Sequence, residues 1–181
     1  MVLVLQRDYF FCEYCGTFQF PSEIDEGIHI LMVSPEGLNC PVCSKDLAQA
    51  SIDGLRGLYC QNCRGLLLAQ VTFGKLVLLR RSRAAGEGER PRPINPLELE
   101  RAIPCPICSQ VMDTHPYYGP GNIVIDNCPT CHIIWLDAAE LKAIQEAPGS
   151  DRGQPIEVKW VKQSENSLLS QSLRRRGLLK D

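Results

Sequence analysis

Aromatic residues, histidines and long apolar runs are all scarce in this sequence. Aromatic side chains make up 7% of its 181 residues, and it contains 3 histidines. No apolar run approaches the roughly 20 residues that a membrane-spanning helix needs, so no membrane association is expected. With so few large side chains, modules of about 40 residues bury too little surface to fold without a metal or disulfides.

Catalytic signatures are missing as well. The sequence has no G-x-S-x-G motif, no phosphate-cradling glycine loop and no HExxH motif, so we expect no enzymatic activity. Its first residues lack the basic segment that precedes the apolar core of a secretory signal. We therefore expect a cytoplasmic protein, in a compartment that keeps thiols reduced.

Cysteine, by contrast, is abundant and regularly placed. All 10 cysteines fall into CxxC pairs, and none stands alone. Disulfide-rich domains scatter their cysteines, whereas a short CxxC knuckle directs two sulfurs at one point, as a tetrahedral thiolate site requires. We therefore predict metal ligands. The pairs are Cys12/Cys15, Cys40/Cys43, Cys60/Cys63, Cys105/Cys108 and Cys128/Cys131.

Two segments of the chain repeat one template. Residues 38–80 and 101–147 each begin with a CPxCS knuckle, continue through a hairpin and reach a second CxxC knuckle. Two such knuckles bring four sulfurs to about 2.3 Å from one zinc ion and leave no open coordination position. The sequence therefore predicts two structural zinc ions. Their ligands are Cys40, Cys43, Cys60 and Cys63 in the first repeat, and Cys105, Cys108, Cys128 and Cys131 in the second.

The second repeat resembles the transcription factor zinc-finger family, the TFIIB-type zinc ribbon. The resemblance lies in its CPIC and CPTC knuckles, in Trp135-Leu136-Asp137 and in the acidic segment that follows. It departs from the family at His132-Ile133, where glycines are usual. The first repeat keeps both knuckles and Gly65 but lacks the WLD triplet and the helix. The resemblance implies a zinc-ribbon fold and zinc binding.

These observations predict small, zinc-bound, β-rich modules with one short helix and little extended core. The expected order is an N-terminal knuckle segment (1–37), zinc ribbon 1 (38–80), a linker rich in charge, glycine and proline (81–100), zinc ribbon 2 with a C-terminal helix (101–147) and a tail (148–181).

Local patterns predict several elements within these modules. Residues 27–33 read as a strand, 34–37 as a turn, and Gly74-Lys75 as a turn between two apolar runs. Asp137 with Glu140 three residues later has capping-box spacing, which predicts a helix there. The tail has a strand pattern over 156–161 and a helix pattern over 164–176.

The pair Cys12/Cys15 is left over, and several interpretations stay open. It can join Cys40/Cys43 in a site that resembles rubredoxin, which implies iron and electron transfer and orphans Cys60/Cys63. His29 can help to complete a third zinc site, or a homodimer can share one metal between two copies of the pair. A reduced dithiol or a redox pair is the remaining alternative.

The leading functional hypothesis is a zinc-binding, non-enzymatic adaptor that presents ribbon surfaces to a protein partner. Nucleic-acid binding or a transcription-associated role is the alternative, and it centres on residues 38–80, which carry five cations and two anions. Arg80, Arg81 and Arg83, with Arg90 and Arg92, form a basic stretch that begins at the end of this module and continues into the linker, where solvated charges are expected. The third hypothesis is electron transfer or thiol redox chemistry through Cys12/Cys15.

Overall fold

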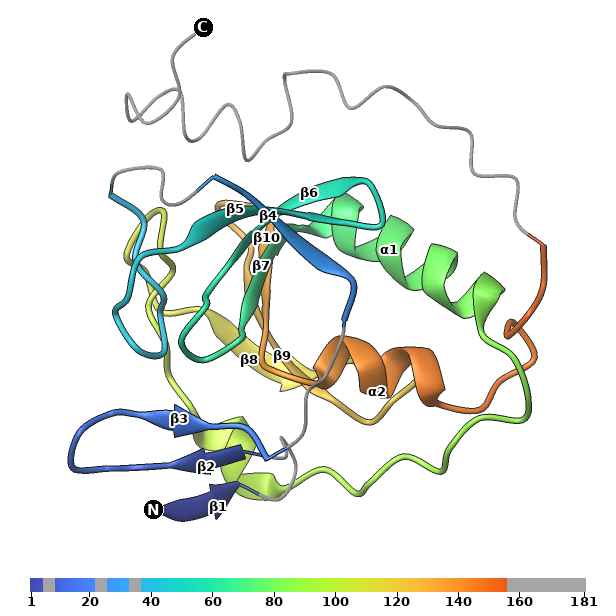
Figure 1. The fold of residues 1–181 in the computed structure, drawn as a ribbon, viewed down its shortest axis with the longest axis horizontal. Coiled ribbons are helices and arrows are strands. Elements are labelled where there is room, and N and C mark those ends of the chain that lie inside the picture. The colour runs from blue at the N-terminus through green and yellow to red at the C-terminus, as the bar shows by residue number, and fades with distance from the viewer. Residues whose placement is uncertain (5–8, 22–25, 33–36, 156–181) are drawn as a thin grey trace, which may run out of the picture.

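Strands make up most of the regular structure in the described part of the chain, which is residues 1–4, 9–21, 26–32 and 37–155 of a computed structural model (Figure 1). The predicted strand over 156–161 and the predicted helix over 164–176 lie outside the described residues, as does most of the predicted turn over 34–37. The predicted strand over 27–33 is confirmed as β4.

A seven-stranded antiparallel sheet joins the two cysteine repeats. Its order is β4-β5-β6-β7-β10-β9-β8, so the first repeat's last strand, β7, pairs with the second repeat's last strand, β10. Apart from β4, the order is the same on both sides of this pair, since each repeat contributes three consecutive strands and its last strand lies at the centre. The strands are β4 (Ile28–Met32), β5 (Ala48–Ile52), β6 (Leu55–Tyr59), β7 (Leu66–Ala69), β8 (Asp113–Pro116), β9 (Val124–Cys128) and β10 (Ile133–Leu136).

The two central strands are apolar throughout because the sheet is covered on both faces. Successive strand residues point to opposite faces. Leu67 and Trp135 belong to a core cluster that contains the cysteines of both repeats. Leu68 and Leu136 belong to a second cluster with the helices α1 (Gln70–Arg83) and α2 (Glu140–Glu146). The molecule thus has three layers: cysteine knuckles, sheet and helices.

Helix α1 is not foreseen by the sequence, and the turn predicted at Gly74-Lys75 is wrong. Its buried side chains recur at helical spacing, at Phe73, Leu76 and Val77 and again near the C-terminal end. No side chain caps the N-terminus, and no acidic residue lies in the first turn. Instead, the backbone N–H of Gln70 donates to the carbonyl of His132 in the second repeat. The start signal is therefore a tertiary contact.

The predicted fold class, small zinc-bound β-rich modules, is confirmed, with a second helix and a shared sheet in addition. The module boundaries stay predictions. Within the stretch 81–100, the first three residues complete α1, and Pro96–Glu100 form a short 3₁₀-helix. Between them, the N–H of Glu89 donates to the carbonyl of Glu146 at the end of α2.

A buried arginine fixes the two helices to each other. Arg81 is only 1% exposed, although the sequence places it in a solvated stretch. Its guanidinium donates to the carbonyls of Ile144 (2.7 Å) and Ala147 (2.9 Å) and pairs with Asp151. The last carbonyls of a helix lack partners within the helix, so Arg81 of α1 caps the C-terminus of α2.

Replacing Arg81 by methionine should lower the free energy of unfolding by about 3 kcal/mol or more, because the buried carbonyls of Ile144 and Ala147 lose the donor that caps them. Arg83→Met is the matched control on the same helix. Its side chain is 58% exposed and pairs with Asp53 at the surface, so it should cost less than about 1 kcal/mol. Urea unfolding followed by circular dichroism measures both, and equal costs would contradict the capping role.

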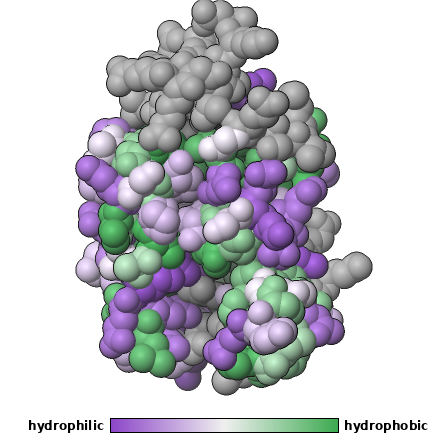
Figure 2. Space-filling view, turned by 90° about the vertical axis from the view of Figure 1, so that its left-hand side faces the viewer, coloured by the Kyte–Doolittle hydropathy of each residue, from purple (hydrophilic) through white to green (hydrophobic). Residues whose placement is uncertain are grey.

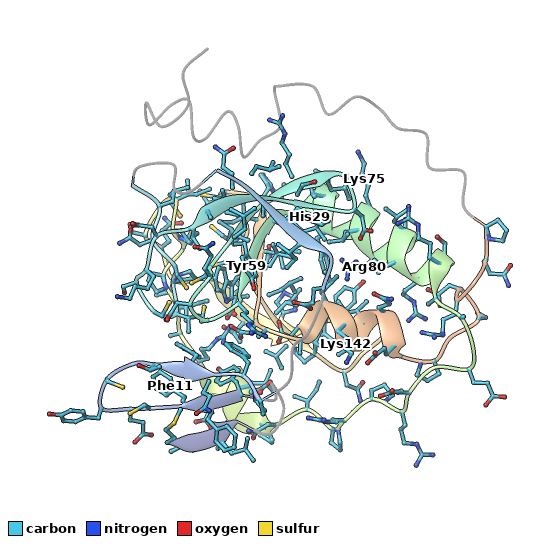
Figure 3. The ribbon with its side chains drawn as sticks, viewed as in Figure 1. Phe11, His29, Tyr59, Lys75, Arg80 and Lys142 are labelled. Atoms are coloured by element: carbon cyan, nitrogen blue, oxygen red, sulfur yellow. The ribbon has the colours of Figure 1, made fainter. Side chains whose placement is uncertain are left out.

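A second buried arginine of α1 lies beside the residues that lead into β4. Arg80 of α1 donates to the backbone carbonyl of Glu26 and pairs with Asp53 at 2.8 Å. The carboxyl Oε1 of Glu26 is buried and has no hydrogen-bond partner among the described residues. Burial raises the pKa of Glu26 to about 7, despite the opposing attraction of Arg80 and Lys142. Figure 3 shows Tyr59, Arg80 and Lys142 in this region.

We expect Glu26→Gln to stabilise the protein increasingly as the pH rises. The unfolded carboxyl loses its proton near pH 4.5, whereas the folded one keeps it to about pH 7, so wild-type stability falls between these values. A glutamine side chain does not titrate, so the stability of the variant does not fall in this way. The variant's advantage should grow from pH 5.5 to pH 8, where it reaches about 2–3 kcal/mol. Urea unfolding of both proteins at each pH gives the difference, and a constant difference would contradict the raised pKa.

Candidate metal centres

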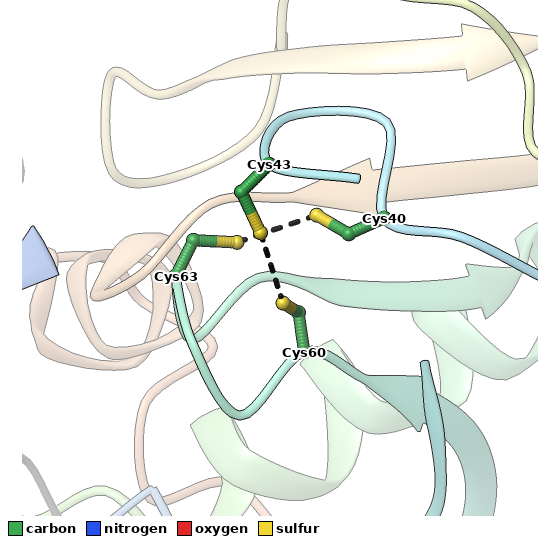
Figure 4. A group of neighbouring side chains, drawn as sticks. All are labelled: Cys40, Cys43, Cys60 and Cys63. Carbon is green, nitrogen blue, oxygen red and sulfur yellow. Dashed lines mark hydrogen bonds between the residues drawn. The ribbon is translucent and has the colours of Figure 1, made fainter. Parts of the chain in front are cut away.

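The first repeat brings four cysteines together at one end of the sheet (Figure 4). Cys40 and Cys43 come from the knuckle before β5, and Cys60 and Cys63 from the knuckle between β6 and β7. All four sulfurs lie within 4.8 Å of one another. The Sγ atoms of Cys40 and Cys63 are 3.4 Å apart, as are those of Cys43 and Cys60. No disulfide links them.

The second repeat builds an equivalent quartet. Cys105 and Cys108 precede β8, while Cys128 and Cys131 flank the turn between β9 and β10. Their sulfurs also lie within 4.8 Å of one another, with 3.6 Å between Cys108 and Cys128. In each quartet three cysteines are buried and one is partly exposed.

Both quartets fit zinc. A regular tetrahedron with metal–sulfur bonds of about 2.3 Å has sulfur–sulfur edges of about 3.8 Å. The observed contacts of 3.4–3.6 Å are close to that edge and far longer than a disulfide bond. Four thiolates fill a tetrahedral zinc ion, so these ions would hold the fold together and would offer no position for a reacting water.

The knuckles owe their shape to one residue in a left-handed conformation. In each quartet knuckle, the residue after the second cysteine has a positive φ, between 53° and 62°. The N–H of this residue donates to the carbonyl of the first cysteine in the knuckles that begin at Cys40, Cys60 and Cys105. Two serines, an arginine and a histidine adopt this unfavourable conformation because the surrounding structure of the knuckle holds the backbone in place. They are Ser44, Arg64, Ser109 and His132.

Without a cation, several of the buried thiols have a raised pKa, whereas hydrogen bonds from Cys40 and Cys63 lower the pKa of Cys60. Burial raises the pKa of the Cys105 thiol to about 11. The pKa values of Cys40 and Cys63 also lie above the ordinary value, chiefly because hydrogen bonds to neighbouring thiols retain their protons. Zinc binds thiolates, so loading each quartet releases protons and becomes weaker as the pH falls.

The second quartet lies inside a segment that a family model recognises. Residues 104–147 match the transcription factor zinc-finger family. This segment is similar to a TFIIB-type zinc ribbon. The match begins just before the first knuckle and ends just after α2, and it does not extend over the first repeat. No curated protein and no solved structure matches the chain.

The WLD triplet of the TFIIB-type ribbon anchors a buried polar network. The indole N–H of Trp135 donates to the Asp137 carboxylate at 3.0 Å. Arg101 pairs with Asp137 and with the fully buried Asp126. The backbone N–H of Asp137 donates to Glu140, which is one half of the predicted capping box. Because the Asp137 side chain is already engaged, α2 begins at Glu140 instead.

Arg101 is a site-organising residue that sequence reasoning missed. It lies before the first knuckle of the second ribbon and outside any motif, yet it joins the carboxylate of Asp126 on β9 to that of Asp137, which follows β10. The pKa of Arg101 lies above its ordinary value, since the attraction of these carboxylates outweighs the cost of burial. The available signal was Asp126 directly after the apolar run 123–125, because a buried carboxylate requires a partner.

The knuckle Cys12/Cys15 joins neither quartet. Cys40/Cys43 pair with Cys60/Cys63, so the rubredoxin-type pairing of Cys12/Cys15 with Cys40/Cys43 is wrong. His29 lies on β4, far from the hairpin that carries Phe11 and the knuckle (Figure 3). No third metal-ligating group is found within residues 1–4, 9–21, 26–32 and 37–155.

Proposed function

We propose that this protein is a zinc-binding adaptor in which the joined ribbons present the outer face of α1 to a protein partner. The observation that carries this proposal is the composition of that face. Val71 is 65% exposed and Leu78 is 56% exposed, one above the other on the helix, with Gly74 between them. A solvated helix face is ordinarily rich in charge.

The chemistry of the two zinc sites supports a binding role over catalysis. Each quartet uses four thiolates, which leaves the metal without an open position. On the side of the molecule that Figure 2 shows, polar and apolar residues are mixed among the described residues. In the part of the chain that the structure describes, no helix has the length and apolar character to cross a membrane.

The use of the arginines favours a protein partner over nucleic acid. Arg80 and Arg83 both pair with Asp53, and Arg81 pairs with Asp151. The basic stretch that the sequence offers for phosphate contact is thus largely neutralised by carboxylates of the same chain. Phosphate binding depends on cations that are free to neutralise the backbone.

The substitution Val71→Asp should weaken retention of the partner by at least about tenfold, because a carboxylate cannot be desolvated in an apolar interface. Val111→Asp is the matched control, since Val111 is also 65% exposed but precedes β8 in the second repeat. Quantitative affinity purification of zinc-loaded wild type and both variants measures the effect. Equal recovery with both variants would contradict the α1 surface.

Fluorescence anisotropy with labelled single-stranded and double-stranded 20-mers tests the competing function. We expect no binding at physiological salt in the range of roughly 10⁻⁴–10⁻⁶ M that non-specific nucleic-acid binders show. Binding in that range that falls steeply with added salt would overturn the adaptor proposal and support a nucleic-acid-binding ribbon protein.

A further inference from the structure

The knuckle that carries Cys12 and Cys15 has the same backbone conformation as the knuckles of the quartets. Gly16 has φ 67°, and its N–H donates to the carbonyl of Cys12 at 2.8 Å. The N–H of Cys12 donates to Thr17 at 2.9 Å. The knuckle at Cys40 has the same two bonds, at 2.9 and 2.7 Å. Residues 12–16 therefore already have the shape that presents two sulfurs to one metal ion.

This knuckle is held on a small sheet of its own. The sheet consists of β1 (Val2–Val4), β2 (Tyr9–Phe11) and β3 (Phe18–Gln19), and the knuckle connects β2 to β3. Phe18 packs against Tyr9 and Phe11, with ring centroids 5.2 and 4.9 Å apart. The guanidinium of Arg64 lies 4.0 Å from the Phe20 ring and ties the hairpin to the first ribbon.

The knuckle is accessible, with Cys12 partly exposed and Cys15 exposed, and the described residues supply no further ligand to it. Cys15 is exposed, and Tyr14 at the tip is 100% exposed. The described residues place no third histidine, cysteine or carboxylate with them. A structural zinc site needs four ligands, so the knuckle supplies one half.

The internal quartets show how two knuckles complete a site. In the first, Cys40 contacts Cys63 and Cys43 contacts Cys60, so the first cysteine of each knuckle meets the second cysteine of the other. This is the contact pattern of a local two-fold axis. A tetrahedron contains such an axis, so two identical knuckles related by a closed two-fold operation can supply all four corners.

We propose that the Cys12–Cys15 knuckle is half of a third four-thiolate zinc site, which the same knuckle of a second copy of this chain completes. The neighbouring strand favours a second copy. β1 is an edge of the small sheet, and its Val2 and Leu3 are 52% and 43% exposed beside Met1 at 62%. These side chains supply apolar surface next to the metal, where a symmetric interface would bury it.

The position of the knuckle separates this proposal from thiol redox chemistry. Redox CxxC pairs typically gain reactivity at a helix N-terminus or beside a cation. Here the pair lies in a β-hairpin turn whose backbone matches that of the metal knuckles. The proposal does not depend on the adaptor function, because it concerns another sheet and another surface.

Native mass spectrometry of the full chain, purified under reducing conditions and titrated with zinc alone, tests the proposal. We expect a dimer that carries two zinc ions per chain and one more between the chains. The double variant Cys12→Ser/Cys15→Ser should lose the dimer and the shared zinc while keeping the quartet ions. Tyr14→Ser changes the exposed tip of the knuckle but neither sulfur, so this variant should keep the dimer and the shared zinc ion.

Three outcomes would overturn the proposal. If the wild type is a monomer that saturates at two zinc ions, there is no shared site. If it is a monomer that binds three zinc ions, the missing ligands lie within one chain. A dimer that the double variant retains does not depend on the knuckle. Since the first two outcomes are read from the wild type, the test stands even if the variant fails to fold.

Discussion

Replacing Cys60 by serine should unfold both ribbons, although the substitution lies in the first. Loss of one thiolate removes the metal from that quartet, and the binding free energy of a structural zinc ion is folding free energy. Because β7 pairs with β10, the second ribbon loses its sheet neighbour. We expect loss of both quartet zinc ions and of most of the unfolding free energy, which is about 5–15 kcal/mol for a typical domain.

The measurement combines zinc counting by native mass spectrometry with urea unfolding. The signals are far-ultraviolet circular dichroism and tryptophan fluorescence, to which the fully buried Trp135 contributes. Cys15→Ser is the matched control, since it changes the same atom in a knuckle outside both quartets and should leave the quartet zinc ions and the large sheet intact. If the variant of Cys60 keeps a folded second ribbon, the two ribbons are independent and this account of their coupling fails.

A single methyl group at Gly65 should also be costly. Gly65 follows the second knuckle of the first ribbon, and a Cβ at this position would lie 2.0 Å from the Trp135 ring. The ring is 0% exposed and held by its bond to Asp137, so it has no space to retreat. We expect Gly65→Ala to lower the free energy of unfolding by about 3 kcal/mol.

Two further variants make this measurement specific. Trp135→Leu in the Gly65→Ala background should recover part of the loss, and the double-mutant cycle gives the coupling between the ribbons. Gly74→Ala is the control: it lies in α1 with open space around its Cβ position, and it should stabilise the protein by about 0.5–1 kcal/mol. A loss at Gly65 no larger than the change at Gly74 would show that the ring adapts.

These contacts explain the use of two ribbons in one chain. An isolated ribbon of about 40 residues has one face of its sheet exposed and depends on its metal. Here each ribbon covers the other: β7 gains β10 as a neighbour, and Trp135 packs over Gly65. Arg81 then caps α2, and Arg101 forms ion pairs with the buried Asp126 and Asp137 in the second ribbon. The two candidate metal sites therefore belong to one continuous sheet.

The sequence by itself determined the chemistry of both quartets. CxxC spacing is a local property, because four residues are enough to direct two sulfurs at one point, and the repeat indicated which knuckles meet. The TFIIB-type ribbon was recognisable for the same reason, since its knuckles, its WLD triplet and its acidic helix start are short contiguous signals. The hairpin turn between β5 and β6 is also a local feature, since an Asp-Gly pair tolerates the positive φ that both Asp53 and Gly54 adopt.

Only the tertiary structure decided how the ribbons combine. The partner of β7, the N-terminal cap of α1 and the burial of Arg81 all depend on residues more than sixty positions away. The apolar run Leu66–Ala69 indicates a strand that is buried on both faces, but it does not indicate which strand pairs with it. Local spacing fixes a metal site because its ligands are close in the chain, whereas sheet order and helix caps depend on which distant surfaces exclude water together.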